Sequence, residues 1–312
     1  MELNRKNKIK FNDITILWLK SKKNIKVQSY QKYEKIINNY IKDSIGNIPI
    51  NTLTKDNIID FFNNIKENEI ALSTQKTLLY IVKASLEYAY NNNYSNYIDL
   101  KDIKLKTLPK TIYVFSKEQQ QTLENKLKEK MNIRKLCLLL CLYTGLRIGE
   151  ICGLKWENIN FNTNSLEIKR TIQRIKDTSS TNSKTKLIES TPKSLTSNRI
   201  VSIPAFIMEY LKKFKSNDDY YILSNSNKLY DPRQFEEFYK RILKKCNINY
   251  MNFHRIRHTY ATRCIESKMD IKTLSEILGH SSVEITLKLY VHPSYELKKS
   301  SVENLVKFMG NY

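Results

Sequence analysis

The sequence predicts a mainly α-helical protein with a small antiparallel β-sheet, divided into two domains. Apolar side chains recur every three or four positions through the first hundred residues, and nothing there alternates with the period of two expected for a strand. Short β-like stretches occur only between residues 157 and 203. A length of 312 residues, of which 41% are hydrophobic, is enough for two packed domains.

Residues 1–95 are predicted to form a helical domain of four helices. The second of these carries Tyr30, Tyr33 and Ile37 at a spacing that places them on one face. The other three helices each have a polar residue near their start that can accept a hydrogen bond from a free backbone N–H. The expected N-caps are Asn12 or Asp13, Thr54, and Ser73.

Residues 96–113 are interpreted as a basic interdomain linker, because the helical period is lost and several lysines and Pro109 occur there. Such a segment either follows DNA phosphates or forms a solvated loop, and the sequence leaves both open. Ser116 and Gln119 match a capping box, so a helix is expected to begin there.

The remaining residues, 114–312, are predicted to form a mixed α+β domain. A buried helix is expected over residues 131–143, and the Ser/Thr/Asn/Lys-rich stretch 177–197 is expected to be an extended hairpin or a mobile loop. The predicted strands cover residues 165–169, 171–175 and 199–203. The later predicted helices cover residues 205–215, 232–246, 253–267, 271–278 and 283–290.

The charge of the chain favours a polyanionic partner. Lys and Arg number 53 against 31 Asp and Glu, which gives a net charge of +22 and an isoelectric point near 9.6. The excess occurs in both halves, with 19 basic and 11 acidic residues over 1–110 and 34 and 20 over 111–312. We therefore expect both domains to contact nucleic acid. A membrane surface and the ribosome are the alternative partners.

The sequence gives no reason to expect a membrane anchor or a disulfide framework. Its longest apolar run, near residues 136–142, is far shorter than the roughly 20 residues that span a bilayer. The N-terminus lacks the apolar stretch of a secretory signal. Five cysteines without a Cys-x-x-Cys pair favour reduced packing cysteines over a zinc site. A cytoplasmic protein that associates with the nucleoid is expected.

Three short motifs carry residues suited to phosphate chemistry. His254 and Arg257 are three residues apart and share a helix face, from which they can hold a phosphate and move a proton. Arg147 is expected at a helix N-terminus, which favours anions. His280 follows a glycine and precedes Tyr290 by ten residues. Each motif alone is more often structural, but the five residues in this order form a far more specific pattern.

This ordered set resembles the tyrosine recombinases, the phage integrase family. The neighbouring residues match as well, in Thr144-Gly145-Leu146-Arg147, His258-Thr259-Tyr260-Ala261-Thr262 and Leu278-Gly279-His280-Ser281. The resemblance is specific over residues 111–312, whereas residues 10–95 resemble the helical SAM-like core-binding domain of the family through their pattern only. It implies a catalytic domain that cuts and rejoins double-stranded DNA at specific recombination sites.

The resemblance implies a role for each matching residue in phosphodiester transfer. Arg147 and Arg257 would clamp the non-bridging phosphate oxygens, which makes a metal or any other cofactor unnecessary. Tyr290 would attack phosphorus and form a 3′-phosphotyrosine. His254 would assist proton movement, and His280 would donate a hydrogen bond to the phosphate.

The general acid is assigned less directly. In the family a lysine on a β-hairpin protonates the leaving 5′ oxygen, and Lys193 best matches that context here. Lys184 and Lys186 lie in the same stretch and are the alternatives. Glu150 is expected to orient or neutralise a neighbouring basic group.

The segment 291–312, beyond Tyr290, is expected to act as an exchange segment. Leu297–Met309 forms an amphipathic stretch, which in recombinases docks on the next protomer. We therefore expect a tetramer assembled on DNA; packing of this stretch on its own domain is the alternative.

Two biological roles fit this resemblance. The chain begins close to the predicted core-binding helices, as Xer-type dimer-resolution recombinases do. The sequence of Ser29–Tyr33 and the long hairpin expected before Lys193 are more similar to integrases of phages or conjugative transposons, and we favour that role. A type IB topoisomerase and a non-catalytic DNA-binding protein are remoter alternatives. The sequence leaves open whether an accessory or directionality protein takes part.

Overall fold

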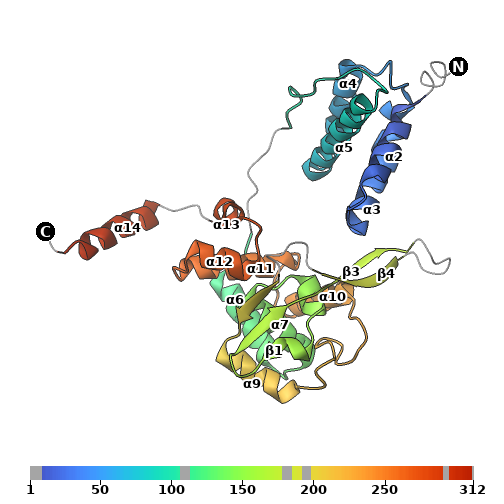
Figure 1. The fold of residues 1–312 in the computed structure, drawn as a ribbon. Helices are drawn as coiled ribbons and strands as arrows, with labels where there is room; N and C mark the ends of the chain where they lie inside the picture. Colours follow the sequence, from blue (N-terminus) through green and yellow to red (C-terminus); the bar gives the residue numbers. More distant parts are fainter. Residues whose placement is uncertain (1–8, 106–112, 178–184, 192–197, 291–294, 311–312) are drawn as a thin grey trace. The chain divides into compact units, whose positions relative to one another are not determined.

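The computed structural model describes residues 9–105, 113–177, 185–191, 198–290 and 295–310 (Figure 1). The chain separates into two compact units, Met1–Lys110 and Thr111–Tyr312. Each unit has a hydrophobic core of its own. No helix in the described ranges is both long and apolar enough to cross a bilayer.

The first unit is the helical domain that the sequence predicts. Its core gathers Trp18, Phe62 and the apolar face of the last helix. The second predicted helix continues into a π-helix, a geometry that is rare outside single turns. The elements are α2 (Phe11–Ser21), α3 (Val27–Ile36), the π-helix η1 (Ile37–Ile41), the short η2 (Ile45–Asn47), α4 (Lys55–Glu67) and α5 (Leu72–Asn91).

Of the three predicted N-caps in this unit, the cap at Thr54 is confirmed. Its Oγ1 accepts a hydrogen bond from the backbone N–H of Asn57 at 3.3 Å. The cap at Asn12 or Asp13 is wrong, because α2 begins at Phe11. Asp13 lies inside the first turn, and its Oδ2 accepts from the N–H of Lys10 at 3.0 Å.

The cap predicted at Ser73 is also wrong. Helix α5 begins at Leu72 and has Ala71 at its N-cap position, with no side-chain cap. Instead, the side-chain amide of Gln75 donates to the carbonyl of Ile70 at 2.7 Å, which ties the first turn to the preceding residue. Polar side chains in a first turn therefore mark a helix start only to within two residues.

The first unit extends past the boundary predicted at residue 95. Leu100 is only 4% exposed and belongs to the core of this unit. Ile98 and Ile103 pack against the same core. Much of the segment interpreted as a linker is therefore part of the first unit, because its apolar side chains are buried there.

The second unit combines helices with antiparallel β-structure, as predicted, but its strands form two small sheets where one was expected (Figure 1). One sheet has the order β1-β2-β5, and β3 pairs with β4 as a hairpin. The strands are β1 (Ile159–Asn160), β2 (Ser165–Ile168), β3 (Thr171–Lys176), β4 (Thr185–Ser190) and β5 (Arg199–Ser202). The helices are α6 (Lys117–Lys128), α7 (Ile133–Thr144), α8 (Ile148–Cys152), η3 (Trp156–Asn158), α9 (Ala205–Phe214), α10 (Pro232–Lys245), α11 (His254–Glu266), α12 (Ile271–Leu278), α13 (Val283–Tyr290) and α14 (Tyr295–Phe308).

Several local predictions for this unit are confirmed. Ser116 and Gln119 form the predicted capping box at the start of α6. Helices α12 and α13 have the predicted bounds. The described part of the 177–197 stretch contains β4, which pairs with β3 in register from Thr171 opposite Ser190. The hairpin alternative is therefore correct for that part.

Candidate active site

A cleft of about 750 Å³ opens in the second unit and contains two of the predicted site residues, Arg147 and His280. Its walls come from α8, the hairpin strand β3, the start of α10, the loop after α12, and α13. The lining residues are Arg147, Ile148, Gly149, Glu150, Thr171, Ile172, Gln173, Arg174, Pro232, Gly279, His280, Ser281 and Ile285.

Arg147 stands at the N-cap position of α8, as the sequence predicts. The chain reaches it through Gly145, which ends α7 with φ of +64°. A Cβ at Gly145 would lie 2.6 Å from Cδ1 of Tyr260, so both the backbone conformation and the space require glycine. The guanidinium of Arg147 donates from Nη1 to Glu150 Oε1 at 2.6 Å and from Nη2 to the carbonyl of Gly279 at 3.2 Å.

Arg257 is buried, with 2% of its surface exposed, in the first turns of α11. Its Nη1 donates to the carbonyl of Gly145 at 3.0 Å, and its Nη2 donates to the carbonyl of Leu278. These carbonyls lie at the C-terminal ends of α7 and α12, where helix geometry leaves carbonyls without a partner and negatively polarised. Arg257 therefore joins two helix ends to the helix that carries it.

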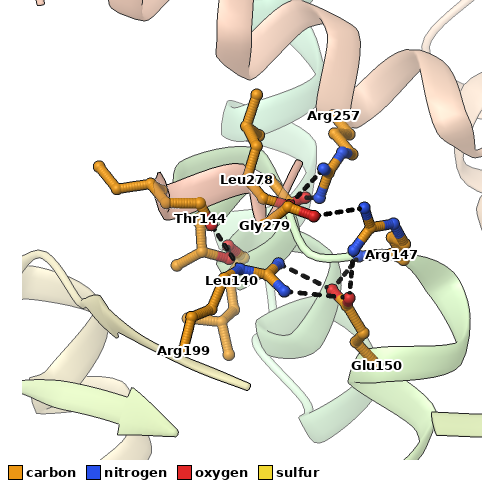
Figure 2. A network of polar contacts seen from close by, with 10 residues as sticks. Leu140, Thr144, Arg147, Glu150, Arg199, Arg257, Leu278 and Gly279 are labelled. Carbon is orange, nitrogen blue, oxygen red and sulfur yellow. Dashed lines mark hydrogen bonds and ion pairs between the residues drawn. The ribbon is translucent and has the colours of Figure 1, made fainter. Parts of the chain in front are cut away.

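Three arginines meet at the end of α12, as Figure 2 shows in part. The successive carbonyls of Ile277, Leu278 and Gly279 accept hydrogen bonds from Arg199, Arg257 and Arg147, respectively. These three side chains come from β5, α11 and the start of α8. The negative end of the α12 dipole offsets part of the repulsion among three neighbouring positive charges.

Glu150 lies between two of these arginines with 4% of its surface exposed (Figure 2). Nη1 and Nη2 of Arg199 donate to its two oxygens at 3.1 and 3.0 Å, and Arg147 bonds it from the other side. Burial raises the pKa of Glu150, but Arg199 and Arg147 outweigh burial and hold the pKa at about 2. Glu150 is therefore a carboxylate at neutral pH, and it contacts basic groups as expected.

Arg199 is a member of this cluster that the sequence analysis missed. Arg199 is 9% exposed, whereas the next residue, Ile200, is 70% exposed. Val201 is buried again, so Arg199 and Val201 share the inner face of β5. In the sequence Ile200 and Val201 are both apolar, so the pattern did not show which face of the strand carries Arg199.

His254 and His280 lie beside the arginine cluster, which makes both imidazoles poor bases. Partial burial and the charges of Arg257 and Arg147 lower the pKa of His254 to about 4. The same causes, with Arg199, lower the pKa of His280 to about 3. His254 also contacts the ring of His258, with ring centroids 4.6 Å apart. Both site histidines are therefore neutral at pH 7.

The helix that carries Tyr290 is held at His280. Nδ1 of His280 and Oγ1 of Thr286 form a hydrogen bond of 2.8 Å, and Thr286 is buried in α13. Tyr290 is the last residue of α13, four positions after Thr286, so the two share a helix face. The side chain of Tyr290 lies outside the described part of the chain, and so does Lys193 with its whole segment 192–197.

The hairpin β3–β4 is attached to the body of the unit by charged side chains. Arg174 of β3 donates to Asp231, the N-cap of α10, and to Oγ1 of Thr185 at 2.7 Å. On the other strand of the hairpin, Glu189 of β4 accepts a hydrogen bond from the hydroxyl of Tyr221, which lies outside the hairpin. The strand that lines the cleft is thus fixed at one edge, and Arg174, whose charge is balanced by Asp231, forms part of the cleft wall.

Arg147, His280 and the α11 pair His254 and Arg257 come from three separate stretches of the chain and lie close together, and Arg147 and His280 line the cleft. Guanidinium groups next to neutral imidazoles are suited to an anionic oxygen and to proton transfer. A model of the phage integrase family matches residues 113–296, and a model of the N-terminal SAM-like domain of phage integrases matches residues 10–66. The chain belongs to the phage integrase family of tyrosine recombinases.

Curated relatives of this recombinase include two kinds of protein. A "Tyrosine recombinase XerC-like" protein of Caldanaerobacter subterraneus subsp. tengcongensis is 31% identical over 306 residues, covering 90% of this chain and 78% of the relative. The "Integrase" of Staphylococcus phage L54a is 24% identical, covering 91% of this chain and 88% of the relative. The resemblance found in the sequence is confirmed, and the enzyme is a site-specific recombinase that cleaves and rejoins DNA.

Solved structures confirm the fold class of the recombinase. The Tn1549 transposon integrase in complex with a circular intermediate DNA superposes with a TM-score of 0.78 at 18% identity, covering 95% of this chain and 99% of that one. A lambda integrase tetramer bound to a Holliday junction gives 0.65 at 14% identity, covering 91% and 78%.

Proposed function

We propose that this recombinase cuts double-stranded DNA with Tyr290 as the nucleophile, and that the cleft beside Arg147 receives the scissile phosphate. The observation that carries the proposal is the convergence of Arg147 and Arg257 on the last carbonyls of α12, next to His280. Two guanidiniums held by carbonyls and a carboxylate are pre-oriented, so they stabilise the extra negative charge of a pentavalent phosphorane without rearranging.

The chemistry is a phosphoryl transfer without loss of bond energy. The phenolic oxygen of Tyr290 forms a bond to phosphorus while the bond from phosphorus to the 5′ oxygen breaks, which leaves a 3′-phosphotyrosine. His254 assists the transfer of the phenolic proton: its imidazole is unprotonated at pH 7, and the negative charge of a bound phosphate offsets the arginine charges that lower its pKa to about 4 in the free protein. His280, held through Nδ1 by Thr286, donates from its other nitrogen to the phosphate.

Lys193 protonates the leaving 5′ oxygen in this proposal. It follows the hairpin β3–β4, whose strand β3 lines the cleft and is fixed by Arg174 to Asp231. The reverse reaction uses the same groups: a 5′ hydroxyl attacks the phosphotyrosine, and Tyr290 leaves. No step of this sequence calls on a metal ion, because the arginines supply the positive charge.

We also propose that the recombinase integrates and excises a mobile element. The fold match to a transposon integrase, at a TM-score of 0.78 over 95% of the chain, and the likeness to a phage integrase support this role. The 31% identity to a XerC-like recombinase favours dimer resolution as the second candidate. Excision of a circle that carries the gene, detected by outward-facing PCR in its host, supports the first role. Loss of plasmid monomers after gene deletion supports the second.

Assembly on DNA is proposed to pass through α14. The apolar side chains described in α14 are exposed, and so is that of Met309 just after it; those in the helix are Val302, Leu305, Val306 and Phe308. A neighbouring protomer in a tetramer on two DNA sites would cover this face, as exposed apolar groups favour burial. The basic excess of both units supports contact with the duplex from each of them.

The nucleophile is tested by trapping the covalent intermediate. A nicked DNA substrate that loses the 5′ fragment after cleavage should accumulate a protein–DNA adduct, and peptide mass spectrometry should find the nucleotide on Tyr290. Tyr290→Phe should bind the same DNA and form no adduct. EDTA should leave the yield unchanged. Attachment at another tyrosine, or a strict need for a divalent metal, would refute the proposal.

A further inference from the structure

Glu150 presents an electrostatic problem for a phosphate site. A buried carboxylate 2.6 Å from Nη1 of Arg147 cancels the charge of the arginine that faces the cleft. It also competes with a phosphate for the same N–H donors. The structure places a second guanidinium, that of Arg199, on the opposite side of the carboxylate, where it bonds both oxygens.

We propose that Arg199 is a positioning residue for DNA cleavage. It holds Glu150 and balances its negative charge, so that this carboxylate does not cancel the positive charge of Arg147 or pull Arg147 away from the scissile phosphate. Arg147, Glu150 and Arg199 together carry one net positive charge. Without Arg199 they carry none, and Glu150 becomes a buried charge paired only with Arg147. This inference rests on the proposed function, which assigns Arg147 to the phosphate.

Arg199 acts through other groups and does not contact DNA in this proposal. Its side chain is 6% exposed, and it is not among the residues that line the cleft. All three of its donor nitrogens are engaged, two by Glu150 and Nε by the carbonyl of Ile277. Arg147, by contrast, has 36% of its side chain exposed toward the cleft.

The bond to Ile277 gives Arg199 a second link to the same site. Ile277 precedes Leu278 and Gly279, whose carbonyls hold Arg257 and Arg147. Arg199 therefore fixes the carbonyl at one end of this row while it fixes the carboxylate that holds Arg147. Removal of Arg199 has two effects: it makes the local charge more negative, and it frees the carbonyl of Ile277. Neutralising Glu150 reverses only the change in charge, so the two effects can be separated.

The test is a charge-compensation experiment on the full-length protein. Single-turnover cleavage of the nicked substrate is measured for Arg199→Met, Glu150→Gln and the double variant, beside DNA affinity and the thermal unfolding midpoint. We expect Arg199→Met to slow cleavage at least about tenfold with little change in affinity, since an electrostatic contact to the transition state is weakened. The double variant should recover most of that loss, because no uncompensated carboxylate remains.

A matched control separates this effect from loss of a structural ion pair. Arg263 of α11 bonds Glu266 and the carbonyl of Phe115, and 22% of its side chain is exposed. Arg263→Met removes comparable bonds without touching Glu150, so it should lower the unfolding midpoint and leave the cleavage rate of the folded protein within about threefold. Arg199→Lys keeps the charge and should cleave faster than Arg199→Met.

A neutral methylphosphonate at the scissile position provides a second readout. It lowers the demand for positive charge, so the ratio of wild-type to Arg199→Met rates should shrink on this substrate. If Arg199→Met does not fold, the cleavage rates of Arg199→Lys and of the double variant are compared with that of the wild type on both substrates instead. A double variant as slow as Arg199→Met, with an unchanged ratio on methylphosphonate, overturns the inference. Wild-type rates for Arg147→Met would instead overturn the phosphate assignment on which it rests.

Discussion

His280 bonds Thr286 through Nδ1 at 2.8 Å, which ties the loop after α12 to the helix that ends at Tyr290. Thr286 has none of its surface exposed, so its hydroxyl has no access to water in place of His280. The pair links a proposed phosphate ligand to the proposed nucleophile over only four residues of helix. In the proposed mechanism, this bond therefore helps to position α13, and with it Tyr290, for the phosphate.

Thr286→Val is expected to slow cleavage roughly fivefold, because it removes one hydrogen bond worth about 1 kcal/mol while it keeps the shape of the side chain. Single-turnover rates on the nicked substrate measure the effect, and DNA affinity should stay at the wild-type value. Thr286→Ser restores the hydroxyl and should recover most of the rate. Equal rates for all three proteins would show that the bond does not position α13.

Arg147→Lys and Arg257→Lys should each slow cleavage by roughly 10²–10³-fold, comparable to losing one oxyanion donor. An ammonium group does not present the planar fork that contacts two groups at once, and Arg257 uses two donors for two carbonyls. Rapid-quench cleavage assays at saturating protein measure the loss. A defect confined to DNA affinity would contradict the assignment to the transition state.

Lys193→Ala should cleave a normal substrate slowly and a modified substrate at nearly the wild-type rate. In the modified DNA, sulfur replaces the 5′ oxygen of the scissile bond and leaves without protonation, so the general acid is no longer needed. Lys184→Ala and Lys186→Ala serve as controls from the same stretch. The variant that sulfur rescues identifies the acid, and rescue of either control in place of Lys193→Ala would reassign the role.

Leu305→Glu and Phe308→Glu should impair recombination between two sites more than binding to one site. Both side chains are exposed in α14, at 58% and 87%, so a charge there does not disturb a core. It does hinder burial of this face against a neighbouring protomer. Gel-shift titrations and recombination assays give the two quantities. Unchanged recombination with both variants would remove α14 from the assembly contact.

Lowering the pH below about 6.5, the pKa of an ordinary histidine, should destabilise the fold. The pKa values of His258 and His280 are lowered to about 4 and about 3, so the folded protein takes up these protons less readily than the unfolded chain. Stability is therefore complete above about pH 6.5 and falls as the pH drops toward 4. Unfolding midpoints from pH 4 to 7 measure the slope, and His258→Gln should reduce it.

Local sequence patterns predicted most of the helices and strands. The amphipathic stretches Ile271–Leu278 and Val283–Tyr290 have the predicted bounds because each is short and is bounded by residues that favour a helix end. The predicted caps at Asp13 and Ser73 were wrong because several polar side chains lie near each helix start, and tertiary packing determines at which residue the helix begins. The assignment of Leu100 to a linker was wrong because its burial depends on a core formed by helices far from it in sequence.

The sequence by itself determined the family and the residue types of the site, because Arg147, His254, Arg257, His280 and Tyr290 follow one another in a specific order. Only the tertiary structure decided how the arginines are held. Arg199 reaches Glu150 across 49 positions, and Arg257 reaches Gly145 across 112, through a strand and helix ends that pack together after folding. Such contacts leave no periodic signal, since each depends on the geometry of two distant segments and on the burial that makes an unpaired charge costly.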